Sequence, residues 1–287
     1  MKLFKFRKQH RVVGAVKLPS KEALDELYAK GMFHDVFREA PDAPASVDYI
    51  TAAKAALATM LGNGPDPTLP AGQGPVGDCI LCEDLHLAAL RACNAGAPWS
   101  PTTAQALAAY SAVTGFTIGD PSTDQGTDPL QLVSWRKAGN PYPDGSTLLD
   151  AIAVDATNPE NLKKAIWLAD GIFMWASLPD EWENEEDGGS IWDVAGPPVP
   201  ANGHGFGGVS YGSNILLTEW GEVDPSVELT FAAAAKYCVP SAGGGVVALL
   251  GSNIIAAATG KCPAGYDLAT LKAYIDGLGA PASLSSP

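Results

Sequence analysis

Cys79 is the residue whose type and position most favour chemistry. It follows a Gly- and Pro-rich stretch, residues 62–77, and the apolar residues after it have helical spacing. The sequence therefore predicts that Cys79 lies at a helix N-terminus, where unpaired N–H groups and the helix dipole favour the thiolate. A thiolate is the nucleophilic form of cysteine, and the same N–H groups can stabilise an oxyanion. The alternative is that Cys79 is a small buried hydrophobic residue.

Cys79 and Cys82 also form a C-x-x-C pair at the start of the predicted helix. Such pairs occur in thioredoxin-like redox sites, where they follow a strand in a βαβ unit. A long Gly/Pro loop precedes the pair in this chain, so redox chemistry is the less favoured interpretation.

His204 is the histidine best placed to act as a base. Glycines flank it in the segment 202–208 and allow close backbone approach at the predicted start of a strand. A histidine there can take a proton from a thiol elsewhere in the sequence. The other histidines lie near the N-terminus (His10, His34) or in mid-helix (His86). The alternative for His204 is an ordinary loop histidine.

No metal or cofactor is expected. Close to Cys79, only His86 and Cys93 could serve as further zinc ligands, which is too few. The acidic runs 120–128 and 180–187 lack the ligand spacing of a known calcium loop, and such runs are usually solvated surface.

Three segments together resemble the papain superfamily of cysteine peptidases. Residues 73–79 (Gln-Gly-Pro-Val-Gly-Asp-Cys) resemble its nucleophile loop, in which a Gln lies six residues before the Cys. Residues 202–212 resemble its histidine strand, with a trailing Gly-Tyr-Gly pattern, and residues 219–222 resemble the segment that holds its Trp-Gly pair. The resemblance spans about residues 44–240.

The resemblance implies roles for individual residues. Cys79 would be the nucleophile and His204 the base, and the 125 residues between them are close to the roughly 130–150 typical of this family. Gln73 and the Cys79 backbone N–H would form the oxyanion hole. Trp220 would shield the His204 contacts from water. The implied substrate is a peptide or protein.

One position departs from the family pattern. The Asn that orients the histidine lies two residues before the Trp, and Thr218 occupies that place here. Strand alternation points Thr218 and Glu219 to opposite faces, which makes Thr218 the expected neighbour of His204 and Glu219 the second choice. A Thr hydroxyl can accept a hydrogen bond but adds no charge, so catalysis is expected to be slow or lost unless a Cys–His dyad suffices.

The elements that must position these residues change in kind along the chain. Helical patterns come first and strands later, which indicates an α+β fold. The resemblance implies a papain-like two-lobed form, with a helical N-terminal lobe and an antiparallel β-barrel-like C-terminal lobe. The predicted helices are 20–30, 49–61, one from residue 79, 103–113, 130–137, 158–168 and 268–278, and the predicted strands are 171–176, 205–211, 214–218 and 246–250.

Composition and resemblance divide the chain into three parts. Residues 1–43 form a basic N-terminal extension, residues 44–240 the papain-like domain (lobes 44–165 and 166–240), and residues 241–287 a C-terminal extension with a terminal helix. Apolar residues make up 46% and charged residues 17% of the chain, so a packed core is expected rather than disorder.

The charge is distributed unevenly. Residues 1–40 carry nine Lys and Arg against five acidic residues, whereas the rest of the chain carries nine against 27. A body this acidic repels nucleic acid and anionic membranes, which argues against both as main partners. The basic N-terminal extension has an electrostatic reason to lie on this body or to attach it to a partner in an assembly.

The location expected from the sequence is the cytoplasm or a phage particle. The basic start lacks the apolar core and cleavage site of a signal peptide. The five cysteines are an odd number at no regular spacing, which fits a reducing compartment. The Gly-Asp-Cys motif resembles a divergent bacterial and phage-associated branch of the family.

Two functions from different classes follow from this sequence. The first is a cysteine peptidase or amidase that cleaves peptide bonds through an acyl-enzyme. The second is a catalytically weakened or inactive papain-like protein with a structural or binding role, for example in a phage particle. The joint presence of Gln73, Cys79 and His204 favours the first.

Overall fold

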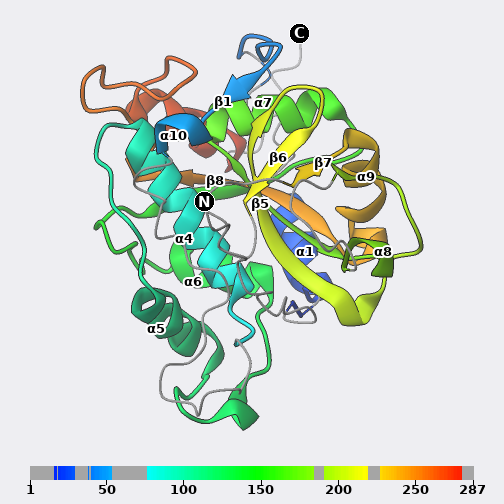
Figure 1. Ribbon diagram of the computed structural model, residues 1–287. Coiled ribbons are helices and arrows are strands. Elements are labelled where there is room, and N and C mark those ends of the chain that lie inside the picture. The colour runs from blue at the N-terminus through cyan, green and yellow to red at the C-terminus, as the bar shows by residue number, and fades with distance from the viewer. Residues whose placement is uncertain are drawn as a thin grey trace, which may run out of the picture.

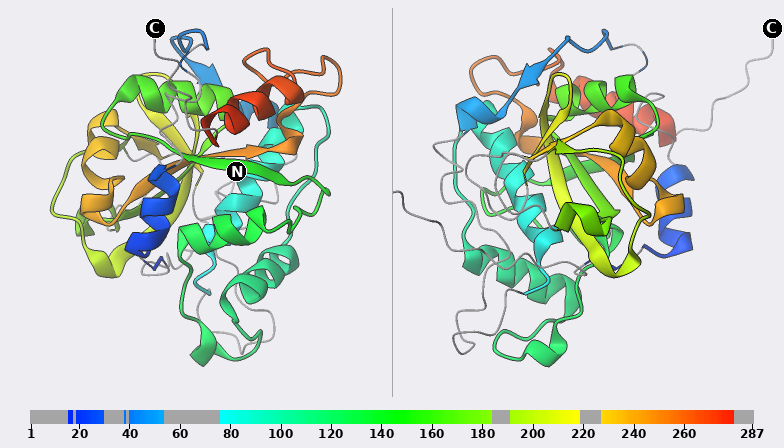
Figure 2. Two further views of the ribbon diagram at one scale, coloured as in Figure 1. Left: turned by 180° about the vertical axis from the view of Figure 1, so that it is seen from behind. Right: turned by 45° about the vertical axis from the view of Figure 1, so that its right-hand side comes forward.

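The computed structural model describes residues 16–17, 19–29, 38, 40–53, 76–183, 191–218 and 227–279 (Figures 1 and 2). Its helices are α1 (Lys21–Ala29), α3 (Ile50–Ala53), α4 (Cys79–Asn94), α5 (Thr103–Thr114), α6 (Pro129–Lys137), α7 (Pro159–Ala169), α8 (Asp180–Glu183), α9 (Phe231–Tyr237) and α10 (Leu268–Gly279). Its strands are β1 (Val47–Asp48), β2 (Leu148–Ala153), β3 (Ile172–Ser177), β4 (Ile191–Trp192), β5 (Gly203–Tyr211), β6 (Ile215–Thr218), β7 (Glu228–Leu229) and β8 (Gly245–Gly251).

Short polar side chains begin several helices. Asn158 and Asp128 each accept a hydrogen bond from a backbone N–H in the first turn of α7 and α6, and a proline follows each of them. Thr102 and Gln105 form a reciprocal capping box at the start of α5. These local signals are why the predicted helix boundaries agree closely with the structure.

One sheet carries the strands in the order β2-β8-β3-β5-β6-β7-β4, and β1 pairs with the end of β5. Neighbouring strands run antiparallel except for β4 and β7. The path ends at β2 and at β4, so the described strands do not close on themselves. The mixed helix-and-sheet character is confirmed, whereas the expected barrel-like lobe is not.

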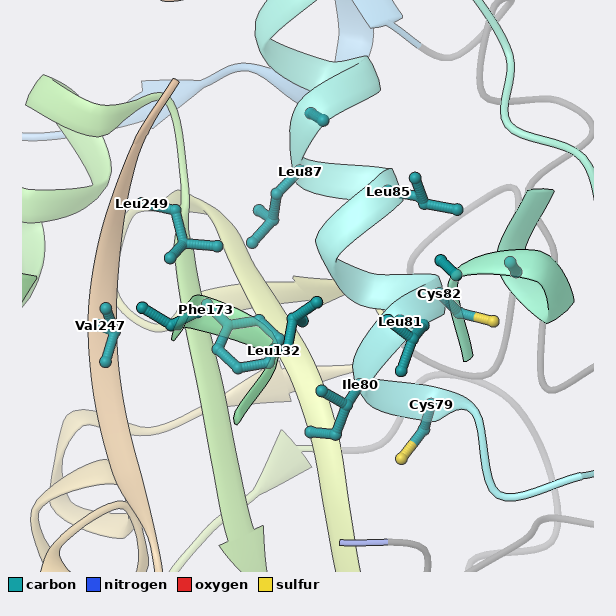
Figure 3. Packing of buried hydrophobic residues seen from close by; sticks show 14 of the residues in the cluster. Cys79, Ile80, Leu81, Cys82, Leu85, Leu87, Leu132, Phe173, Val247 and Leu249 are labelled. Atoms are coloured by element: carbon teal, nitrogen blue, oxygen red, sulfur yellow. The ribbon is translucent and has the colours of Figure 1, made fainter. Parts of the chain in front are cut away.

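Each face of the sheet packs against its own set of helices. On one face, Phe173, Val247 and Leu249 meet the apolar side of α4, as Figure 3 shows. On the other face, alternate residues of the same strands, such as Met174 and Ala248, pack with α7 and α9. The long, almost entirely buried helix α4 therefore lies directly on the sheet, and its N-terminus reaches β5 (Figure 1).

Two features of the sheet were not predicted. The sequence of β2, Leu-Leu-Asp-Ala-Ile-Ala, is rich in residues that favour helices, and its pairing with β8 about a hundred residues later makes it a strand. β8 comes from the part assigned to a C-terminal extension, yet it lies between β2 and β3. The domain boundaries themselves stay predictions.

The predicted helix 49–61 begins as α3, and its later residues lie outside the described part of the chain. Within the described residues, no helix combines the length and apolar character that crossing a bilayer requires.

Candidate active site

Cys79 is the first residue of α4, as the sequence predicted. The turn before it is closed by the Asp78 carbonyl, which accepts hydrogen bonds from the N–H groups of Leu81 and Cys82, both at 2.9 Å. The bond from Leu81 uses one of the N–H groups that a helix start leaves without an i→i−4 partner, and the bond from Cys82 is the first i→i−4 bond of the helix. Cys79 thus projects from the beginning of a well-formed helix.

An acidic loop holds the segment in front of Cys79. Asp124 accepts the Gly77 N–H through Oδ2 at 2.9 Å and the Tyr110 hydroxyl through Oδ1 at 2.5 Å. The run 120–128 is expected from the sequence to be solvated surface, but its residue Asp124 has a structural role. Asp124 lies four residues before the helix cap Asp128, and that position carries no sequence signal for a contact with Gly77 or Tyr110.

The Cys79 sulfur lies against β5. The backbone N–H of Gly205 donates a hydrogen bond to it, and Gly205 directly follows His204. A Cβ atom on Gly205 would overlap the Ile80 side chain and lie 3.5 Å from the Ile80 Cα, so the close approach of strand and helix depends on glycine. In Figure 3 the sulfur atoms of Cys79 and Cys82 point away from each other, which does not support a redox pair.

The Cys79 thiol is protonated in this arrangement. Burial raises the pKa of Cys79 to about 12, the Gly205 N–H opposes this rise, and the Asp78 carboxyl adds to it. Burial also raises the pKa of Asp78 to about 8. The helix N-terminus was expected to favour the thiolate, but removal from water outweighs it because only 3% of Cys79 is exposed.

His204 lies at the start of β5, where its backbone pairs with Ala176 of β3. The side chain is buried, and its ring stacks beside that of Phe206 with centroids 6.3 Å apart. Asn202, just before the strand, donates from Nδ2 to the Asp180 carboxylate at 2.9 Å. These contacts fix the backbone on which His204 is carried.

Thr218, at the end of β6, pairs with Gly207 of β5. Its hydroxyl donates to Glu83 Oε1 at 2.6 Å, and Glu83 Oε2 lies 3.3 Å from His86 Nδ1. The Thr218 hydroxyl is therefore hydrogen-bonded to helix α4. A role of Thr218 in orienting His204 stays a prediction. Sequence reasoning missed Glu83, although an acidic residue one turn after Cys79 in an apolar helix is a usable signal.

Three predicted site residues, Gln73, Glu219 and Trp220, lie outside the described residues.

Residues 16–17 of the N-terminal extension lie beside the start of β5, the strand that carries His204. The Lys17 N–H donates to the Thr127 carbonyl at 3.0 Å, and Val16 forms a parallel bridge with Thr127. A Cβ atom on Gly203 would lie 2.9 Å from the Val16 carbonyl oxygen. Residues 16–17 therefore contact both the segment before α6 and the residue next to His204.

Among the described residues, no three Cys, His, Asp or Glu side chains gather in a way that could hold a metal ion.

Comparisons with known proteins give a likeness in structure. No family model matches the chain, and no curated protein matches its sequence. Among solved structures, it is similar to that of digestive procathepsin L 3 from the larval midgut of Tenebrio molitor, with a TM-score of 0.51 and 16% sequence identity over 80% of this chain and 79% of that one. This likeness shows the fold, which is papain-like.

Proposed function

We propose that this protein is a cysteine peptidase or amidase that hydrolyses peptide bonds through Cys79 and His204. The observation that carries this proposal is the hydrogen bond from the Gly205 N–H to the Cys79 sulfur. It joins the start of α4 to the strand position next to His204, across 126 residues of chain. The papain-like fold supports the proposal independently.

The reaction begins when His204 takes the proton of the Cys79 thiol and the thiolate attacks the carbonyl carbon of the substrate. A C–S bond forms while the carbonyl π electrons move onto the oxygen. The Cys79 N–H, together with Gln73, stabilises that oxyanion. His204 then gives its proton to the departing amine as the C–N bond breaks, which leaves a thioester on Cys79.

Water completes the cycle. His204 accepts a proton from the water molecule that attacks the thioester, and the new C–O bond forms. The C–S bond then breaks, the carboxylic acid product leaves, and His204 returns its proton to the sulfur, which restores the Cys79 thiol. Atoms and protons balance without a metal or a redox partner.

The protein is proposed to exist in a latent state. Cys79 is 3% exposed and Val16 lies against Gly203, the residue before His204, so we propose that residues 16–17 move before a substrate reaches the pair. The raised pKa of Cys79 fits this state, since water would enter once the segment is displaced.

The same burial favours a second candidate, a papain-like protein that binds partners without catalysis. In that case the basic N-terminal extension attaches the acidic body within an assembly. The two candidates differ in whether Cys79 reacts as an activated thiol.

Alkylation by iodoacetamide at pH 7, with each cysteine followed by peptide mass spectrometry, distinguishes them. It is performed on the wild type and on Gly203→Ala, in which Val16 must shift. The peptidase proposal expects Cys79 to react faster than a free thiol in at least one of these proteins, and His204→Ala to abolish the excess. Half-buried Cys93 is the internal control. Reaction of Cys79 no faster than a free thiol in both proteins would contradict the peptidase and favour the binding protein.

A further inference from the structure

Glu83 is a buried carboxylate that the proposed reaction does not use. It lies on α4 one turn after Cys79, and 2% of it is exposed. Residues four apart on a helix share a face, so Cys79 and Glu83 both turn toward β5. There they lie beside Gly205 and Gly207, the next position on the same side of the strand.

The Glu83 carboxylate is held at a defined position between α4, β5 and β6. The Thr218 hydroxyl donates to Oε1 at 2.6 Å, and His86 Nδ1 lies 3.3 Å from Oε2. A Cβ atom on Gly207 would overlap Oε1 and lie 2.7 Å from the Thr218 Oγ1. Both the glycine and the hydroxyl therefore serve to hold the carboxylate in place.

The groups around the Glu83 carboxylate come from α4, β5 and β6. Cys79, Cys82 and His86 lie on α4 itself, with Asp78 at its start. From β5 comes His204, three residues before Gly207 and so about 10 Å away along the strand. From β6, the neighbour is the Thr218 hydroxyl, and Glu219 follows it in the sequence outside the described residues.

We propose that the Glu83 carboxylate shifts the pH range in which Cys79 and His204 form a charged pair to higher pH. This inference rests on the proposed function and deepens it. A buried negative charge stabilises the protonated imidazole and destabilises the ionised thiol, so both ionisations move upward. At roughly 6–10 Å inside a protein, each shift is about one pH unit.

The pKa values of the neighbouring thiols shift in the direction expected from this charge. The charge of Glu83 is among the causes that raise the pKa of Cys79, after burial and the charge of Asp78. It also contributes to the raised pKa of Cys82, where burial is again the main cause.

Thr218 has a defined part in this arrangement. A threonine hydroxyl has one proton to donate, and Thr218 gives it to Glu83. Thr218 therefore acts by holding the carboxylate in position. Thr218 itself is uncharged and stands where the papain superfamily has Asn, but its hydroxyl links it to the Glu83 carboxylate on α4.

The test is the pH profile of Cys79 alkylation in the wild type, Glu83→Gln and Glu160→Gln. It is measured from pH 4 to 10 in whichever background, wild type or Gly203→Ala, labels Cys79. Glu83→Gln keeps the shape of the side chain and removes its charge, and we expect both midpoints of the profile to fall by about one pH unit. Glu160→Gln removes one charge from the exposed side of α7 and should leave both midpoints in place.

A second variant keeps the proposal testable if Glu83→Gln does not fold. Thr218→Val removes the hydroxyl that holds the Glu83 carboxylate in place, so the negative charge is positioned less firmly beside Cys79. We expect both midpoints of the Thr218→Val profile to fall by less than those of Glu83→Gln, and the double variant Glu83→Gln/Thr218→Val to shift no further than Glu83→Gln alone. Additive shifts would contradict a role for Thr218 through Glu83.

The outcomes separate this inference from the proposed function. A profile that is lowered equally at every pH, or that moves equally in Glu160→Gln, overturns the role of Glu83 while the dependence on His204 stands. Cys79 labelling that does not depend on His204 overturns both.

Discussion

The backbone N–H of Gly205 on β5 donates a hydrogen bond to the sulfur of Cys79 at the start of α4. The contact requires the strand and the helix to approach closely beside Ile80. The residue type at position 205 therefore controls how near the proposed nucleophile lies to the strand that carries His204.

Gly205→Ala should separate α4 from β5. The added methyl group would overlap Ile80, so we expect the free energy of unfolding to fall by about 1–3 kcal/mol and Cys79 alkylation to slow. Urea unfolding and peptide mass spectrometry measure the two effects. Gly212→Ala is the matched control, because nothing lies within 4 Å of its added Cβ atom. Equal behaviour of the two variants would show that the close approach is not needed.

Gly203→Ala should loosen the N-terminal extension. Its Cβ atom would lie 2.9 Å from the backbone oxygen of Val16, which cannot turn away as a flexible side chain could. We expect faster alkylation of Cys79 and faster amide hydrogen exchange in α1, again with Gly212→Ala as the control. Unchanged labelling together with faster exchange in α1 would mean that residues 16–17 do not limit access to the thiol.

Asp84→Ala should destabilise the helical side of the fold strongly. Asp84 Oδ2 lies 2.8 Å from both Nε and Nη2 of Arg136, and its Oδ1 accepts the Tyr142 hydroxyl at 2.8 Å. Without this carboxylate the buried Arg136 guanidinium loses its oppositely charged partner, which should lower the free energy of unfolding by about 3–5 kcal/mol. Urea unfolding measures this loss.

Glu160→Ala is the control for Asp84→Ala. It breaks the exposed pair with Lys163, for which a change below about 1 kcal/mol is expected. A similarly small change for Asp84→Ala would show that the buried pair is not a major source of stability.

Stability should fall as the pH rises from about 4 to 8, because of Asp78. Burial raises the pKa of this carboxyl to about 8 in the folded state, so between these values the folded chain holds a proton that the unfolded chain has released. The contribution is complete below the unfolded pKa and is lost as the pH rises through the folded pKa. Asp78→Asn cannot ionise, so it should remove this loss of stability. The free energy of unfolding, measured with urea across that pH range, should then fall by several kcal/mol less than in the wild type.

Asp170, whose pKa burial raises to about 7, should leave a residual slope in the Asp78→Asn variant. A slope in Asp78→Asn as steep as in the wild type would place the pH dependence elsewhere.

Features that depend on local signals could be predicted from the sequence. Caps such as Asn158 and Asp128 act on N–H groups two residues away, and the start of α4 at Cys79 follows from a Gly/Pro loop that gives way to apolar spacing. The Gly-rich run from residue 203 likewise predicted β5. Each of these signals lies within a few residues of the structure it specifies.

Contacts between distant segments were decided by the tertiary structure. β2 is a strand because β8 lies beside it. The position of the Glu83 carboxylate is fixed because Gly207 and Thr218 contact α4 at that point. Their partners lie a hundred or more residues away, beyond the reach of any local pattern.

The protonation of Cys79 shows the difference most clearly. By itself, the sequence determined that this cysteine begins a helix, and the helix N-terminus favours a thiolate. Only the tertiary structure decided that β5 and the rest of the fold remove the sulfur from water, and burial there raises its pKa to about 12. Desolvation depends on every segment that packs around an atom, so the larger of these two opposing effects is set by the folded chain as a whole.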